Sequence, residues 1–305
     1  MPNFKPLRLT TMILGIWMAT AYPTQISKHT TYTTHTDQTL QSIGHDKHLG
    51  LDALCLANPL LNPYIPLPKG TTIALPTSSL IPLTPQPLPS IVVNLPEKRL
   101  YLLKEPESAF VASVGRPGWS TPTGTYQIIE KKEKPVWLVP AMIRQEQAQL
   151  GKPLPKVIQP GKTNPLGQYM LRLSSPSYLI HGTNDELETT IGQEQTAGCI
   201  SLYPQDIAEI FHRTNIHDKV KIVNQPVKVA RCQSDWCLEV YPEYTTVIND
   251  RNVTGQSYQE TDHQRNQAIL TYLSLLKAAD INKELIQKML KEKTGIPHII
   301  AHQQH

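Results

Sequence analysis

The chain has 305 residues, of which 39% are hydrophobic and 18% charged, with a formal net charge of +4. This balance excludes an intrinsically disordered protein, and the length suffices for a sizeable core and two domains. The small positive charge suits an anionic polymer as partner. It is too small for the dense basic surface of a nucleic-acid-binding protein, so no nucleic acid is expected.

The first 21 residues have the pattern of a secretory signal peptide. Lys5 and Arg8 precede an apolar stretch, Leu9 to Ala21, which ends in the small-x-small pattern Ala19-Thr20-Ala21. The stretch is shorter than the about 20 residues that a membrane-spanning helix needs. We therefore expect cleavage after Ala21 and no membrane span in the mature protein, with an uncleaved anchor as the alternative.

Residues 32–76 have a pattern of their own. Asp37 to Ile43 begins like a capped helix, Leu51 to Ala57 is a second helical run, and Thr71 to Pro76 forms a closing strand after Gly70. This order is similar to that of a LysM module, a small βααβ glycan-binding unit. The resemblance implies glycan binding, and a packing domain without glycan affinity is the alternative.

A Pro-rich segment at 77–89 predicts a stiff linker, and the domain at 90–225 follows it. Strand-like runs alternate with turns through this domain, which predicts a mainly β fold. The expected strands are 91–95, 100–103, 109–114, 126–130, 169–173, 178–181 and 220–223. A short helix is expected from Pro204 to Phe211, because proline suits the first turn of a helix.

The stretch from His181 to Leu202 contains the candidate chemistry. His181 and Gly182 follow an apolar run, and after a polar loop comes Thr196-Ala197-Gly198-Cys199-Ile200-Ser201. A thiol attacks carbonyls as the thiolate, and a nearby imidazole can take its proton and later protonate a leaving amine. Backbone N–H groups near Gly198 and Cys199 are candidates for an oxyanion hole. The alternative for Cys199 alone is a buried structural cysteine.

The spacing resembles the catalytic motif of the L,D-transpeptidase (YkuD) family. That motif is His-Gly, a spacer of this length, and Ser/Thr-His-Gly-Cys-hydrophobic-Arg/Asn. The matching residues are His181, Gly182, Thr196, Gly198, Cys199 and Ile200. Ala197 and Ser201 depart from it, since His is frequent at the first position and Arg or Asn at the second. Framework segments such as Thr121 to Tyr126 and Asn164 to Gly167 extend the resemblance over about 90–225.

The resemblance implies a β-sandwich or barrel of the YkuD type, preceded by the βααβ module and followed by a helical tail. It implies that Cys199 attacks the carbonyl between the diamino acid and the terminal D-Ala of a peptidoglycan tetrapeptide stem, with His181 as base and acid. Gly182, Gly198 and Thr196 would shape the loop and oxyanion site. Ser201 and Tyr169 would lie near the substrate, and the loop from Leu150 to Asn164 beside the active site. No metal and no organic cofactor is implied.

An amine would then resolve the thioester, either on another stem peptide, which forms a crosslink, or on the terminal Lys of an outer-membrane lipoprotein. Both acceptors place the protein in the periplasm. Two alternatives remain from the sequence. One is a hydrolase on the same scaffold, in which water replaces the amine. The other is a non-catalytic peptidoglycan-binding protein, in which Ser201 marks the loss of activity.

The C-terminal part contains a Cys pair and two helical runs. Cys232 and Cys237 flank four residues between alternating runs, which predicts a hairpin at 226–245 with a disulfide across its neck. Two reduced thiols, or half of a metal site, are the alternatives, and the sequence has no second Cys pair of this kind to complete a zinc site. The segment 258–305 is predicted as a helical tail, with helices at about 261–278 and 281–293 and Gly295 as the second C-cap. We assign no chemistry to this tail.

Overall fold

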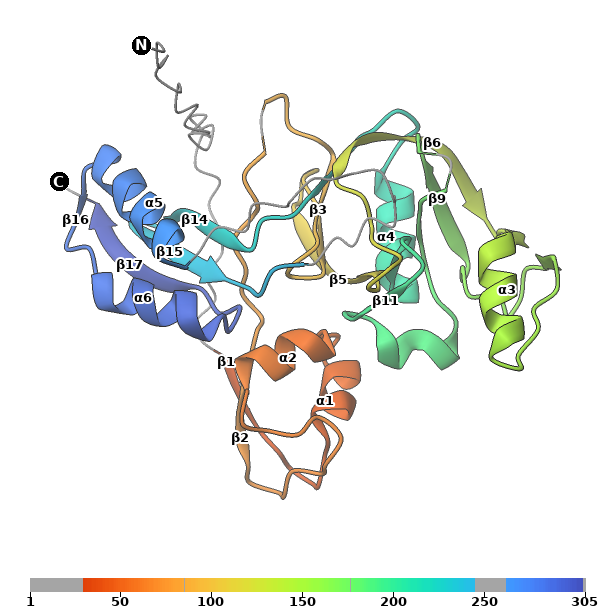
Figure 1. Cartoon of the computed structure of the whole chain (residues 1–305), viewed down its shortest axis with the longest axis horizontal. Coiled ribbons are helices and arrows are strands. Elements are labelled where there is room, and N and C mark those ends of the chain that lie inside the picture. Colours follow the sequence, from red (N-terminus) through yellow and green to blue (C-terminus); the bar gives the residue numbers. More distant parts are fainter. Residues whose placement is uncertain (1–29, 85, 176, 245–261, 304–305) are drawn as a thin grey trace, which may run out of the picture.

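A computed structural model describes residues 30–84, 86–175, 177–244 and 262–303. Three parts are visible in Figure 1: a central β-barrel, a small module with two helices below it, and a second sheet with two helices on the left. The predicted signal peptide at 1–21 lies outside the described residues. Within the described part of the chain, no helix is long and apolar enough to cross a membrane.

The central sheet closes on itself, which confirms the mainly β prediction. Its order is β5-β12-β10-β9-β6-β13-β3-β4, with β4 pairing back to β5 and β11 added beside β5. The strands are β3 (Ile91–Asn94), β4 (Arg99–Leu102), β5 (Ser108–Gly115), β6 (Gly124–Glu133), β9 (Tyr169–Leu173), β10 (Leu179–His181), β11 (Glu194–Thr196), β12 (Ile200–Leu202) and β13 (Lys219–Val223). Closure removes the free sheet edges that would otherwise invite aggregation.

Alternating side chains fill the barrel. On β9, for example, Leu171 and Leu173 are fully buried in the core, whereas Arg172 between them points outward. Helix α4 (Pro204–Arg213) starts with proline as predicted and contributes Ile207 and Ile210 to the same core. The barrel therefore has a packed interior, so a binding site has to lie on its outer face or in its loops.

Two excursions leave the barrel next to β10. The first lies between β6 and β9 and comprises β7 (Trp137–Leu138), α3 (Ala141–Gln149) and β8 (Val157–Ile158), with β7 paired to β8. The sequence analysis did not predict α3, which buries no residue and therefore lacks the apolar stripe by which helices are recognised. The second is a 3₁₀ helix, η1 (Asp185–Thr190), between β10 and β11.

The N-terminal module has the predicted βααβ order. It comprises β1 (Thr30–Thr33), α1 (Leu40–Asp46), α2 (Leu51–Ala57) and β2 (Thr72–Leu75), and β1 pairs antiparallel with β2. Thr39 caps α1 and forms a reciprocal capping box with Ser42. The module has its own small core, formed mainly by leucines and isoleucines of α1, α2 and β2.

This module is packed against the barrel and touches the segment that joins His181 to Cys199. Lys98 at the start of the barrel pairs with Asp52 of the module at 3.2 Å and with Glu194 at 3.1 Å. A Cβ atom on Gly192 would collide with Gly50 of the module. The two glycines therefore permit a close backbone approach between the module and this segment.

The C-terminal part forms one unit, although the sequence analysis treated its hairpin and its helices separately. Its elements are β14 (Val227–Cys232), β15 (Asp235–Val240), α5 (Asp262–Leu275), β16 (Ala278–Ala279), α6 (Lys283–Glu292) and β17 (His298–Gln303). The sheet order is β14-β15-β17-β16, and α5 and α6 share one apolar core with it. Both helices were predicted. The strands β16 and β17 were not, because β16 is two residues long and β17 alternates too weakly to stand out.

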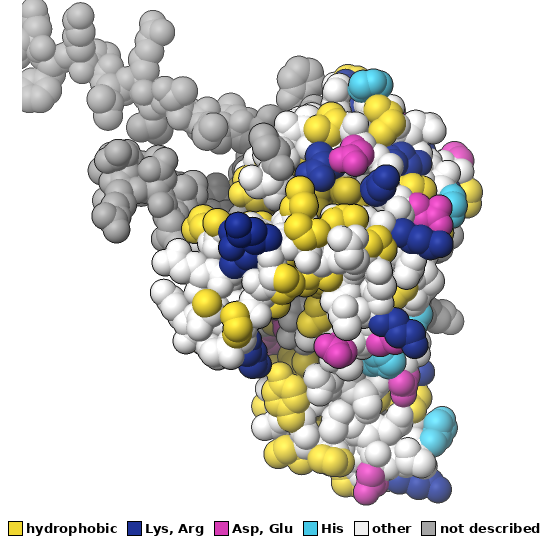
Figure 2. All heavy atoms as spheres, turned by 90° about the vertical axis from the view of Figure 1, so that its right-hand side faces the viewer, with side chains coloured by type: hydrophobic (Ala, Val, Ile, Leu, Met, Phe, Trp, Pro, Cys, Tyr) yellow, Lys and Arg dark blue, Asp and Glu magenta, His cyan; other side chains and the backbone are white. Residues whose placement is uncertain are grey.

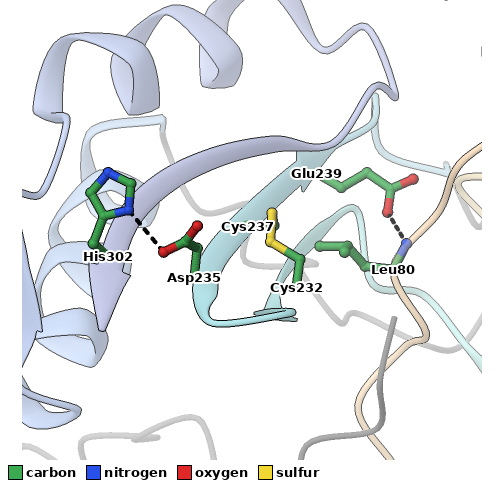
Figure 3. The surroundings of a disulfide bond; sticks show 6 residues. All are labelled: Leu80, Cys232, Asp235, Cys237, Glu239 and His302. Carbon is green, nitrogen blue, oxygen red and sulfur yellow. Dashed lines mark hydrogen bonds and ion pairs between the residues drawn. A yellow bond between two sulfur atoms is a disulfide. The ribbon is translucent and has the colours of Figure 1, made fainter. Parts of the chain in front are cut away.

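Cys232 and Cys237 form a disulfide across the neck of the β14–β15 hairpin, as the sequence predicts, with their Cα atoms 5.9 Å apart. Figure 3 shows this bond between Leu80 on one side and the β17 residue His302 on the other. Leu80 is fully buried and packs against both cysteines. The disulfide is therefore part of the contact between the hairpin and the segment at 77–89.

The segment at 77–89, predicted as a stiff linker, has neither helix nor strand in its described residues, but it is firmly attached to its neighbours. Leu80 N–H donates to Glu239 Oε2 at 2.6 Å, and Leu80 O accepts from Lys228 Nζ at 2.6 Å. Leu83 and Gln225 exchange two further hydrogen bonds. The backbone N–H and C=O groups of Leu80 and Leu83 are thus hydrogen-bonded to side chains of Glu239, Lys228 and Gln225. These bonds hold the segment in place, so it is not a flexible spacer.

A buried ionic cluster joins the barrel to the C-terminal unit at the same place. Lys228 Nζ lies 2.6 Å from Glu97 Oε2 of the barrel and 2.9 Å from Glu239 Oε2 of β15. The side chains of both glutamates are fully buried, and that of Lys228 is 2% exposed. Charges removed from water require such pairing, so this cluster links the stability of the two parts.

Candidate active site

Neighbouring parallel strands bring His181 and Cys199 together on the outside of the barrel. Ile180 and His181 of β10 are in register with Ile200 and Ser201 of β12, which sets Cys199 beside Leu179. Ile180 and Ile200 point into the barrel core. Because side chains alternate along a strand, His181 and Cys199 share the opposite, outer face of adjacent strands.

His181 is held in one tautomer by its own backbone. Its ring is buried, and Nδ1 lies 2.6 Å from Gly182 O. A carbonyl oxygen only accepts hydrogen bonds, so Nδ1 carries the proton and Nε2 keeps its lone pair. Burial lowers the pKa of His181 to about 4, although the hydrogen bond to Gly182 acts in the opposite direction. At neutral pH the ring is an uncharged base.

Cys199 is half-buried and uncharged in the resting site. It packs beside Leu166, Leu179 and Met170, and its Sγ lies 3.8 Å from Ser177 O. Burial raises the pKa of the Cys199 thiol, whereas the Leu179 backbone and the charge of Arg172 act to lower it. The resting site therefore presents a neutral thiol and a neutral imidazole on the same outer face of the sheet.

The loop before Cys199 is a tight turn built on Gly198. Gly198 has φ +99°, and a Cβ atom there would lie 2.7 Å from the Tyr178 ring. Thr196 Oγ1 accepts from Gly198 N–H at 3.1 Å and donates to Cys199 O at 2.6 Å. This corrects one expectation from the sequence: Gly198 N–H, a candidate oxyanion donor, is already bonded within the turn.

A second network supports this turn from below. Thr121 Oγ1 donates to Gly198 O at 3.0 Å and accepts from Gly115 N–H at 2.9 Å. Tyr244 OH in turn donates to Gly115 O at 2.7 Å and accepts from Thr121 N–H at 3.0 Å. Tyr244 follows the β14–β15 hairpin and is buried in the barrel core. The C-terminal part therefore helps to position the nucleophile loop.

The other predicted site residues divide between the two faces. Ser201 of β12 is buried in register with His181 of β10, and Gly182 N–H donates to Tyr169 O at 3.1 Å. The side chain of Tyr169 does not reach the site, contrary to the sequence prediction. It turns inward and packs on Phe211 of α4, with ring centroids 4.7 Å apart. The reason is the alternation on β9, where the adjacent Met170 occupies the outer face.

The excursion between β6 and β9 borders the apolar cluster that contains Cys199. Trp137 of β7 packs on the same apolar cluster as Cys199. Arg116, next to the nucleophile turn, forms an ion pair with Glu146 of α3, in which one guanidinium nitrogen lies 2.5 and 2.6 Å from the two carboxylate oxygens. Leu138 and Met142 of this excursion are largely exposed. Figure 2 shows this side of the molecule, where hydrophobic side chains reach the surface among Lys and Arg side chains.

Sequence reasoning missed three residues of this site. Arg172 alternates with Leu171 and Leu173, so its outward direction was readable once β9 was placed. Trp137 lies on a two-residue strand without a pattern. Tyr244 lies far from Thr121 in sequence, and nothing in the residues around it indicates the contact. Both of these depend on tertiary structure alone.

Comparisons with known proteins point to one protein family. The YkuD family model, described as an L,D-transpeptidase catalytic domain, matches residues 89–222. The chain is 30% identical over 266 residues to the probable L,D-transpeptidase YcfS of Escherichia coli, covering 85% of this chain and 79% of that protein. It is also 30% identical over 267 residues to the probable L,D-transpeptidase ErfK/SrfK of Salmonella typhimurium, covering 85% and 82%.

Among solved structures, L,D-transpeptidase 3 from Mycobacterium tuberculosis aligns with a TM-score of 0.34 and 18% identity. The alignment covers 44% of this chain and 61% of that one.

Proposed function

This chain belongs to the L,D-transpeptidase family, and from that premise we propose that Cys199 and His181 are its nucleophile and its base. The observation that supports these roles is the tautomer of His181. Its Nδ1–H is bonded to Gly182 O, so the free Nε2 lone pair is available on the face that also presents the Cys199 thiol. This arrangement generates a thiolate only when a substrate carbonyl is present.

The proposed acyl donor is a peptidoglycan tetrapeptide stem. His181 Nε2 takes the thiol proton as Sγ of Cys199 attacks the carbonyl before the terminal D-Ala. The tetrahedral intermediate collapses to a thioester, and the imidazolium returns the proton to the leaving amine of D-Ala. An acceptor amine then attacks the thioester, His181 takes its proton, and the thiol is regenerated.

The oxyanion of this intermediate needs a hydrogen-bond donor other than Gly198 N–H, which Thr196 already engages. We assign that role to the N–H of Cys199, which lies next to the attacking sulfur. Thr196 and Thr121 would act as positioning residues, because both fix the carbonyl groups on either side of the turn. The Cys199 N–H would therefore already point toward the oxyanion position before the substrate binds.

The proposal extends to location and partners. The N-terminal sequence pattern supports secretion, with the signal peptide at 1–21 removed in the periplasm. The βααβ module supports glycan binding as in a LysM module, and its contact with the 182–196 segment would keep the active site close to the wall. The acceptor would be an amine of a second stem or the terminal Lys of an outer-membrane lipoprotein.

Product analysis tests the proposed reaction. The mature chain is incubated with a tetrapeptide stem and an excess of a stem or lysine-ended peptide as acceptor, and the products are separated and weighed. We expect D-Ala release and an amine adduct, both absent with Cys199→Ala. Release of only the free tripeptide acid in excess acceptor would instead support a hydrolase. Wall binding without D-Ala release would support the non-catalytic alternative.

A further inference from the structure

The outer face of the barrel carries one basic residue in the same cross-strand row as the nucleophile. Arg172 of β9 is in register with Leu179 of β10, which in turn lies beside Cys199. On the other side, Arg172 is in register with Glu130 of β6. Strands β6, β9 and β10 and the residue just before β12 thus present Glu130, Arg172, Leu179 and Cys199 in a line, with the single residue Leu179 between Arg172 and Cys199.

These side chains share the outer face. The next row toward the C-terminus of β10 consists of Leu171 and Ile180, which are fully buried in the barrel core. Successive rows alternate between the two faces of a sheet. Neighbouring strands are about 4.8 Å apart, so two strand spacings separate the backbones of Arg172 and Cys199. An arginine side chain spans much of that distance.

The present partner of Arg172 is easily exchanged. Its Nε donates to Glu130 Oε2 at 2.7 Å, and the two side chains are 37% and 45% exposed. Exposed ion pairs of this kind contribute little to stability, because water and salt compete for both charges. A carboxylate that is buried against the site by other contacts would compete successfully for the guanidinium, which binds carboxylates through two parallel hydrogen bonds.

The positive charge of Arg172 acts on the Cys199 thiol. Burial raises the pKa of Cys199, and Arg172 is the charged side chain that opposes that shift. The next row on the outer face consists of Lys132, Met170, His181 and Ser201. It places no basic side chain next to His181, because Met170 lies between Lys132 and His181. Arg172 therefore combines a position in the same row as Cys199 with a charge that acts on the thiol.

We propose that Arg172 binds the C-terminal carboxylate of the acyl donor, exchanging Glu130 for it while the scissile carbonyl lies against Cys199. This inference rests on the proposed function, because it assigns the recognition of the terminal D-Ala. It explains how the site would select a chain end over an internal peptide bond. Departure of D-Ala would return Arg172 to Glu130 and free the site for the acceptor.

The first test does not depend on transpeptidation. Cys199 is alkylated with iodoacetate, which is anionic, and with iodoacetamide, which is neutral, and peptide mapping gives the rate at Cys199. The ratio of the two rates cancels any change in thiolate fraction. We expect Arg172→Gln to lower the iodoacetate-to-iodoacetamide ratio by about threefold, and Arg172→Lys to retain part of it. Lys132→Gln, which removes a charge from the neighbouring row, leaves the ratio within about 1.5-fold. An equal fall in both variants, or none in either, overturns the proposal.

The second test uses two donors, the tetrapeptide stem and its C-terminal amide. Arg172→Gln is expected to lower kcat/KM for the free acid by about tenfold and to leave the amide within about twofold. Equal losses on both donors would mean that Arg172 only maintains structure, and would overturn the proposal. If wild-type protein releases neither D-Ala from the free acid nor D-alaninamide from the amide, the proposed function fails, and the alkylation ratio still decides the role of Arg172.

Discussion

His181→Ala is expected to slow acylation of Cys199 by about 100- to 10,000-fold, which is the range that general acid–base catalysis contributes. The variant keeps the thiol but removes the Nε2 lone pair, and burial has already raised the pKa of that thiol. Attack then depends on the small thiolate fraction present at neutral pH. Stopped-flow or quenched measurement of acylation by a stem peptide or a β-lactam gives the rate.

His263→Ala is the matched control, because His263 is an exposed residue at the start of α5 in the C-terminal part. It should leave the rate unchanged. The pH profile gives a second readout. The neutral ring is the active form and its pKa is lowered to about 4, so the acid limb of wild type should fall near pH 4 rather than near 6.5. An acid limb near 6.5, or a small effect of His181→Ala, would contradict the role assigned to His181.

Lys228→Met is expected to lower the free energy of unfolding by about 3–5 kcal/mol. Methionine fills a similar volume but leaves Glu97 and Glu239 buried without the ammonium group that lies between them. Removing one member of a buried ion pair leaves the charge of the other buried without a partner, and here both carboxylates lose theirs. Urea or thermal unfolding of the two proteins at neutral pH measures the difference.

Lys288→Met provides the control for this loss. Lys288 lies on α6, its side chain is 64% exposed, and its contact with Glu292 is 4.0 Å long, so we expect a change within about 0.5 kcal/mol. Acid should partly rescue Lys228→Met. Burial raises the pKa of Glu239, so the folded state takes up a proton before the unfolded state as the pH falls, and the penalty shrinks. A Lys228→Met protein as stable as wild type would contradict this account of the cluster.

The catalytic motif was readable from the sequence because its residues are close along the chain and specific to a chemistry. The motif led to the expectation that the fold brings His181 and Cys199 together, and β10 and β12 run in parallel register at this place. The strand β12 itself was not among the expected strands. The roles of individual backbone groups were not readable in the same way. Only the structure shows that Thr196 Oγ1 engages Gly198 N–H.

Contacts between distant segments account for most of what the sequence did not predict. The 77–89 segment has the composition of a linker, yet Leu80 is fixed by Lys228 and Glu239, about 150 residues later. Tyr244 reaches Thr121 and Gly115 across a comparable distance. Such pairs leave no periodic signal, because neither partner alters the pattern of its own element.

Short strands were not predicted from the sequence, because they too depend on contacts with distant segments. The predicted tail helices are present, but β16 has two residues and gains its place only by pairing with β17. Tyr169 was expected near the substrate, with a position in the core as the alternative. Its inward direction follows from the alternation on β9, which becomes certain only when Met170 and Arg172 are seen on the outer face.

The proposed reaction requires Cys199 to be an activated nucleophile. The decisive measurement is the intact mass of the mature protein after incubation with a carbapenem, whose strained amide carbonyl is open to attack by a thiolate. Cys55→Ala is the matched control, because Cys55 is the other free cysteine among the described residues and lies in the N-terminal module.

We expect one covalent adduct on wild type and on Cys55→Ala, and none on Cys199→Ala. This result would place the reactive thiol beside His181. A folded, reduced wild-type protein that forms no adduct, or an adduct that persists in Cys199→Ala, would contradict the proposed mechanism.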